Sequence, residues 1–257
     1  VISGVDTLDA ASHIAGSPEL PIRCCYGNDE EFNEAITATA TSSVFVLCPT
    51  ALATIWMLRV WETIQELPFK LLVTRGTMEE LRRKGEDNSQ APKMYVSKLG
   101  NEYVRHDVSA MDVEQYRTKL REFYHWLLSN SETVDGLALL QVEAEKREML
   151  VQMFGDNAAQ SMAVAAATDS ILWTDDIAIA EFSSTSLGVQ RTWSEILFAH
   201  LRDNKTINSV ELAEFGAEMP GYGYRHFRLT PDVAIACATR LCRSILARKT
   251  KSSIILP

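Results

Sequence analysis

Acidic side chains follow two short apolar segments of the chain, where parallel strands would place them close together. The pair Asp175-Asp176 comes directly after one segment, and Glu80 lies on the helix predicted after another. Asp156 opens the helix predicted before the later segment. Because ligands of open α/β sheets bind outside the carboxyl ends of the strands, we expect these acids at one edge of a sheet.

A cluster of carboxylates points to a divalent cation. Neighbouring carboxylates raise one another's pKa unless a cation neutralises them. Oxygen-only ligand sets favour Mg²⁺ or Mn²⁺, and such a cation can orient and activate water against a phosphodiester bond. The sequence therefore predicts metal-assisted hydrolysis, with Glu80, Asp156 and Asp176 as metal ligands and with Glu80, Asp175 and Asp176 as catalytic residues.

Each of these acids also has a structural explanation. Asp175-Asp176 could cap the following helix, whose first residues need hydrogen-bond acceptors. Glu79 and Glu80 could form a solvated first turn, where acids suit the helix dipole. Asp156 follows a glycine and is a natural N-cap.

The elements that would position these residues alternate between short strands and long helices. Residues 44–47, 70–73 and 170–174 are apolar runs typical of central parallel strands covered on both faces. A hairpin with its turn at Gly100-Asn101 is predicted over residues 93–108, and an edge strand over 187–189. Helices are predicted at residues 29–38, 51–67, 78–84, 111–129, 137–154, 157–168, 177–183 and 193–201. This order indicates an α/β fold with a central parallel sheet.

Three regions are predicted along the chain. Residues 1–42 form a peripheral N-terminal segment, residues 43–201 the core, and residues 202–257 an extension packed on the core. A helical insertion at about residues 112–154 lies between the second and third core strands. The chain opens on Val rather than Met, so we expect a piece of a longer protein whose other domains are partners.

Composition excludes several classes of protein. The chain has 257 residues, 46% hydrophobic and 23% charged, which is ordinary globular composition. Its 25 Lys and Arg against 34 Asp and Glu give a net charge of −9, so nucleic-acid contact requires a local basic patch. Five cysteines without a zinc-like array indicate free thiols in a reducing cytoplasm. The longest mostly apolar run, residues 44–58, is shorter than the ~20 residues of a membrane helix, so no membrane partner is expected.

Two segments could supply a basic patch. Residues 221–228 interleave aromatic and basic side chains, including Arg225 and Arg228, and this pattern suits single-stranded RNA or DNA. The C-terminal tail carries Arg243 and Lys249 among its cations and could steer a phosphate backbone. An exposed strand and the solvated face of a C-terminal helix are the structural alternatives.

Three segments resemble, in order, the motifs of PIN domains. Residues 46–52, Val-Leu-Cys-Pro-Thr-Ala-Leu, are similar to the family's opening Leu-Asp-x-Ser/Thr-Ala-Leu. Residues 77–82, Thr-Met-Glu-Glu-Leu-Arg, resemble the second motif, where a Glu precedes Leu-Arg. Residues 171–176, Ile-Leu-Trp-Thr-Asp-Asp, resemble a strand that ends Thr-x-Asp. The resemblance runs from about residue 43 to 201 and extends to PIN-like modules at the ends of larger bacterial multidomain proteins.

The resemblance implies a three-layer α/β/α fold and a cytoplasmic, metal-dependent ribonuclease. Glu80 matches the family's second acid, Asp176 the acid after the third strand, and Asp156 is the nearest candidate for the remaining one. The largest departure is Cys48, which stands where the first Asp belongs. A neutral thiol is a poor Mg²⁺ ligand, and a thiolate favours softer metals.

Three hypotheses about function follow. The first is a PIN-like nuclease that uses Mg²⁺ or Mn²⁺ to cleave RNA. The second is a degenerate module, favoured by Cys48, that serves in RNA binding or protein interaction. The third is an unrelated α/β scaffold whose acids are helix caps. All three leave open whether the chain forms a homo-oligomer.

Overall fold

A five-stranded parallel sheet forms the centre of the molecule. The computed structural model describes residues 22–24, 28–86, 94–99, 102–107, 109–225, 228 and 230–252. The sheet order is β6-β3-β2-β7-β8, and every pairing in it is parallel. Its strands are β6 Glu132–Val134, β3 Lys70–Thr74, β2 Val44–Leu47, β7 Ile171–Trp173 and β8 Arg191–Thr192.

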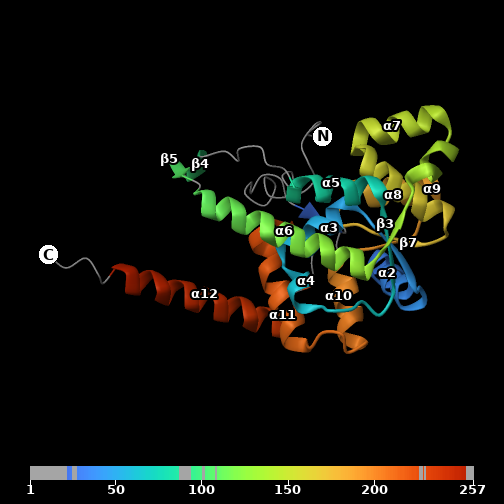
Figure 1. Cartoon of the computed structure of the whole chain (residues 1–257). Coiled ribbons are helices and arrows are strands. Elements are labelled where there is room, and N and C mark those ends of the chain that lie inside the picture. Colours follow the sequence, from blue (N-terminus) through green and yellow to red (C-terminus); the bar gives the residue numbers. More distant parts are fainter. Residues whose placement is uncertain are drawn as a thin grey trace.

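Helices cover both faces of this sheet (Figure 1). Successive strand residues point to opposite faces, so Phe45 and Leu47 lie in one apolar cluster and Val46 in another. The described helices are α2 Asp29–Thr41, α3 Pro49–Met57, α4 Val60–Thr63, α5 Arg75–Glu86, α6 Ala110–Asn130, α7 Ala144–Phe154, α8 Asp156–Ala167, α9 Ile177–Leu187, α10 Ser194–Asp203, α11 Ser209–Glu218 and α12 Pro231–Ser252, with the 3-10 helices η1 Gly136–Gln141 and η2 Met219–Tyr222. The predicted three-layer α/β/α fold is confirmed.

The two apolar clusters are built by different helices. The cluster that contains Phe45 takes buried side chains from α2 to α6 and from α10 and α11. The cluster that contains Val46 takes them from η1, α7, α8 and α9. Because both faces are covered, the central strands are apolar throughout, and this is why their sequence shows no alternation.

Several element boundaries differ from the sequence-based expectations. The helix expected at residues 51–67 is divided into α3 and α4, because Arg59 adopts a left-handed conformation with φ of 53°. The helix expected at residues 137–154 is η1 followed by α7. The edge strand expected at residues 187–189 was wrong, since α9 continues to Leu187 and the strand β8 begins later.

Short pairings complete the fold. The predicted hairpin is confirmed as β4 Met94–Leu99 paired antiparallel with β5 Glu102–Asp107. The turn predicted between them at Gly100-Asn101 lies outside the described residues, as does most of the segment 1–42. Strand β1, Ile22–Arg23, pairs in parallel with β9, Tyr224–Arg225, and so joins the start of the described chain to the segment that precedes α12. No helix in the described part is long and apolar enough to cross a membrane.

Asp175 is a buried carboxylate that joins this small sheet to the large one. Only 1% of its surface is exposed. It accepts hydrogen bonds from the backbone N–H of Ser194 at 2.8 Å, from the hydroxyl of Ser194 at 2.6 Å and from the hydroxyl of Thr54. The thiol of Cys24 donates to it at 3.6 Å, and Thr54 also hydrogen-bonds the hydroxyl of Tyr224. The carboxylate therefore links β7, α3 and α10 to residues beside β1 and in β9.

Burial raises the pKa of the Asp175 carboxyl, and the hydrogen bonds from Ser194, Thr54 and Cys24 offset that effect only in part. A carboxyl whose pKa is raised by folding stabilises the fold below its unfolded pKa and loses that contribution as the pH rises. Asp175 therefore opposes folding more strongly at neutral pH than in mild acid.

We predict that Asp175→Asn is tolerated better as the pH rises. The stability of the variant relative to the parent should increase between about pH 4 and pH 8, by about 1.4 kcal/mol per unit of pKa shift, because Asn cannot ionise. Urea denaturation across this range measures the difference, with Asp176→Asn as a matched control that removes the neighbouring charge. A difference between variant and parent that stays constant with pH would contradict the prediction.

Candidate functional site

The carboxyl ends of β2, β3 and β7 meet at one edge of the sheet. Val46 of β2 is paired with Leu72 of β3, and Leu47 is paired with Trp173 of β7. The residues that follow the strands are therefore neighbours, and the backbone N–H of Cys48 continues the pairing by donating to Trp173 at 2.9 Å. The parallel register thus assembles the edge predicted from the sequence.

Threonine hydroxyls fix the turn after β7 against the start of α3. The hydroxyls of Thr50 and Thr174 are 3.0 Å apart. Each accepts a backbone N–H from the acidic pair, Thr50 from Asp175 and Thr174 from Asp176, both at 3.3 Å. These bonds hold Asp175 inside the protein and leave Asp176 at the edge.

Asp176 is the N-cap of α9. One carboxylate oxygen accepts the backbone N–H groups of Ala178 at 2.8 Å and Ile179 at 3.2 Å. The helix-capping interpretation is therefore confirmed for Asp176, although not for the buried Asp175. Within the described part of the chain, the second oxygen of Asp176 has no hydrogen-bond donor, so it can still contact a ligand.

Cys48 lies beside Asp176 as a neutral group. Its side chain is 0% exposed and packs in the apolar cluster with α8. Burial raises the pKa of the thiol to about 11, against the lowering effect of hydrogen bonds with Thr50 and Thr174, and the charge of Asp176 raises it further. Because a thiol ligates metals as its thiolate, Cys48 is a poor ligand at neutral pH.

Glu80 accepts a hydrogen bond from the side chain of Asn157. The side-chain amide of Asn157, near the start of α8, donates to one carboxylate oxygen of Glu80 on α5. Gly76 allows this approach, because a Cβ there would lie 2.3 Å from the amide oxygen of Asn157. Asp156, the acid predicted for this place, is exposed and accepts a hydrogen bond from Gln160 of its own helix at 2.7 Å.

Asn157, Thr50 and Thr174 are the edge residues that were not selected from the sequence. The helical spacing of α8 indicates that Asn157 faces the sheet, because it lies one turn before Ser161. Its carbonyl accepts from Ser161, one turn later, and the same hydroxyl also lies 3.3 Å from the carbonyl of Leu47 in β2. Residues at this spacing face the strands. Asp156 is exposed one position earlier, and the Gln160 side chain that donates to it lies against Gly76 and Gly136.

The basic residues proposed for nucleic-acid binding belong to elements other than those that form this edge, and the side chains of two of them lie outside the described residues. Arg228 pairs with Asp29 at 2.5 Å and lies 3.8 Å from the centre of the Phe32 ring. Arg225 is exposed on β9. The side chains of Arg243 and Lys249 lie outside the described residues, although both positions fall in α12. At the edge itself, Arg75 forms an exposed ion pair with Asp135 at 2.6 Å.

The donor set at the edge does not fit a divalent cation. Among the described residues, no three His, Cys, Asp or Glu side chains are grouped so that they could hold a metal ion. Cys48 is neutral, Asn157 directs an N–H toward Glu80, and Asp175 is turned into the protein. Hard cations such as Mg²⁺ require several oxygen ligands, and this edge offers few of them.

A family model accounts for this fold. It is described as a PIN domain associated with the TPR-GreAB-C-PIN system, and it matches residues 46–185, more than half of the chain's 257 residues. The match begins in β2 and ends in α9, so it contains Cys48, Glu80, Asn157 and Asp176. No curated protein and no solved structure matches the chain. The fold, the edge and the matched region together show that the chain belongs to the PIN-TPR-GreABC family of PIN domains.

Proposed function

We propose that this chain is a non-catalytic PIN-like module that acts by binding other proteins of a larger system. The observation that carries the proposal is the buried, protonated Cys48 thiol beside Asp176, at the place where a PIN domain would carry its first carboxylate. The amide of Asn157 beside Glu80 supports the same proposal. Two neutral groups therefore stand where metal-assisted cleavage needs negative oxygen ligands.

The remaining carboxylates are engaged in structural contacts. Asp176 caps α9 and Asp175 accepts hydrogen bonds inside the protein. Glu80 accepts from Asn157. Few carboxylates lie close together at the edge, so the repulsion between them that a cation would relieve is weak. The electrostatic attraction of the edge for a divalent cation is therefore small.

Exposed apolar side chains beside the edge support a role in protein interaction. Leu137 and Leu140 of η1 are each 65% exposed, and they lie three residues apart on a 3-10 helix, so they share one side of it. Helix η1 packs against α8, which carries Asn157. Exposed apolar patches mark interaction sites, whereas the net charge of −9 disfavours a phosphate backbone. The family description associates the domain with a TPR-GreAB-C-PIN system, which supports binding to TPR or GreAB-C domains.

The second candidate is a metal-dependent ribonuclease that uses Mg²⁺ or Mn²⁺. The observation that favours it is the carboxylate oxygen of Asp176 without a hydrogen-bond donor in the described chain. Glu80, Asp176 and the exposed Asp156 would then hold the ion, and single-stranded RNA would contact Arg225 or the basic part of α12. The family resemblance to nucleases supports this candidate, and the neutral Cys48 opposes it.

We predict that Cys48→Asp combined with Asn157→Asp creates cleavage that the parent lacks. The two substitutions restore negative oxygen ligands beside Asp176 and Glu80, so Mn²⁺-dependent cleavage of single-stranded RNA should rise by about a hundredfold or more. The assay follows a labelled RNA with Mn²⁺, with and without chelator. Cys48→Ser combined with Asn157→Ser is the neutral control and should stay inactive.

The parent protein decides between the two candidates in the same assay. Cleavage by the parent that a chelator abolishes, and that Asp176→Asn reduces by orders of magnitude, would establish the ribonuclease. If the parent binds RNA without cleaving it, the module's partner is RNA and the proposed protein partner is wrong. A double Asp variant that folds and yet gains no cleavage would contradict the account of Cys48 and Asn157.

We also predict that the apolar pair on η1 contributes to protein binding. Leu137→Asp combined with Leu140→Asp should weaken binding to a segment that carries the TPR and GreAB-C domains by about tenfold or more, because charges oppose burial of this surface. Surface plasmon resonance measures the affinity. Met111→Asp, at a position 70% exposed on α6, is the matched control. Equal affinity of the Leu variant and the parent would exclude this surface.

A further inference from the structure

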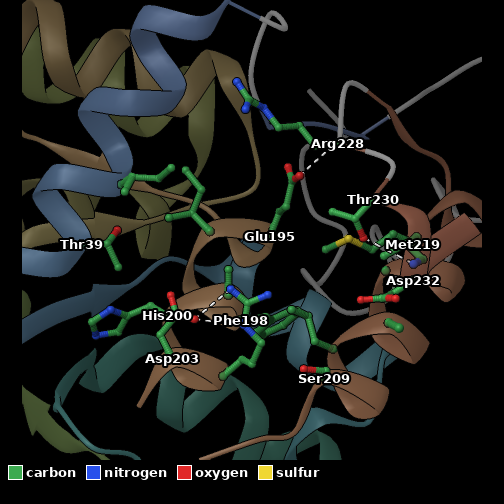
Figure 2. A pocket seen from close by; sticks show the side chains of 18 of the residues that line it. Thr39, Glu195, Phe198, His200, Asp203, Ser209, Met219, Arg228, Thr230 and Asp232 are labelled. Atoms are coloured by element: carbon green, nitrogen blue, oxygen red, sulfur yellow. Dashed lines mark hydrogen bonds and ion pairs between the residues drawn. The ribbon is translucent and has the colours of Figure 1, made fainter. Parts of the chain in front are cut away.

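A second site is formed by helices at the two ends of the described chain. A pocket of about 520 Å³ lies among α2, α10, α11 and the start of α12 (Figure 2). Its lining residues all fall at positions 32–40 or 195–233, outside the residues 46–185 that match the family model. The pocket therefore lies outside the matched region, and its lining shares no residue with the edge that carries Cys48.

The pocket combines an apolar lining with carboxylates. Phe198, Leu212 and Met219 are among the apolar residues, and Figure 2 shows Glu195 and Asp232 among the labelled side chains around them. A volume of this size suits a small ligand that buries most of its surface, and the apolar residues favour an apolar body.

The cations of the pocket are already paired. Arg202 bonds its neighbour Asp203 at 2.8 Å, and Arg228 pairs with Asp29 outside the pocket. Glu195 accepts the backbone N–H of Arg228 at 2.6 Å on one oxygen and the indole N–H of Trp193 at 3.3 Å on the other. Within the described residues, neither Glu195 nor Asp232 forms an ion pair. The unpaired charges that the described side chains leave in the pocket are therefore negative.

An aromatic ring in the wall already binds a cation. The guanidinium of Arg228 lies 3.8 Å from the centre of the Phe32 ring, and both residues line the pocket. Such contacts are attractive because the ring face is electronegative. Arg228 already covers this ring face, so the carboxylates are the groups of the wall that are left to recognise a positively charged ligand.

We infer that this pocket binds a small organic cation, an amine or a guanidinium carried on an apolar body. The charged group would lie against Glu195, with Asp232 across the pocket, and the apolar body would lie against Phe198, Leu212 and Met219. A charge-assisted hydrogen bond to a half-buried carboxylate is stronger than a neutral one and gives the site its preference for cations. The inference does not depend on the proposed function of the edge.

Methyl NMR with phenethylamine as the probe tests the inference. In protein labelled at Ile and Met methyl groups, the lining residues Ile36, Ile196 and Met219 should shift in a saturable manner, whereas Ile171 in the sheet should not. The matched anion 3-phenylpropionate should leave all of them unchanged. The titration is run above neutral pH, because burial raises the pKa of the Glu195 carboxyl.

Two variants and a control identify the groups responsible. Glu195→Gln keeps an acceptor for the N–H of Arg228 and should weaken phenethylamine binding by about tenfold or more. Ala199→Leu should fill the pocket and abolish binding, whereas Glu214→Gln, an equal change of charge at an exposed position outside the lining, should have no effect. The inference is overturned if the parent shows no saturable shift, if the anion binds equally well, or if Glu195→Gln binds like the parent.

Discussion

The inward turn of Asp175 is the constraint on which the edge of the sheet depends. Hydrogen bonds from Ser194 and Thr54 hold this carboxylate inside the protein, at a cost in solvation that shows in its raised pKa. The next residue, Asp176, is then left at the edge, where it caps α9. Through Cys24 and Tyr224, the same carboxylate fastens the short sheet of β1 and β9 to the core. One acid of the pair is thus structural, and only its neighbour can meet a ligand.

This arrangement keeps the scaffold of a PIN domain and places other side chains at the position of its metal ligands. The parallel register brings the residues after β2 and β7 together, so the scaffold of a metal site is present. The groups that occupy it are a protonated thiol at Cys48, which is buried in an apolar cluster, and a partly exposed amide at Asn157, which donates to Glu80. Fold alone does not imply activity, because chemistry depends on the side chains placed at a site. The proposal of a binding module in place of a hydrolase rests on those side chains.

The sequence was sufficient for the fold and for part of the site. Continuous apolar runs revealed the central strands, whereas β6 was missed because its three residues, one exposed and two half-buried, carry too little pattern. Glu80 and Asp176 could be placed from strand ends, but Asp156 could not be distinguished from Asn157, since one residue on a helix changes the face by about 100°. The pocket was missed because its walls come from segments far apart in sequence, which only tertiary packing brings together.

The central claim is that the edge cannot hold a divalent cation, and Mn²⁺ binding to the parent protein tests it most directly. Electron paramagnetic resonance of free Mn²⁺, titrated with the protein, reports bound ion without requiring activity. The account predicts no stoichiometric binding tighter than about millimolar, because few carboxylate oxygens face the edge. A single tight site that is lost in Asp176→Asn would contradict it and would return the chain to the metal-dependent nucleases.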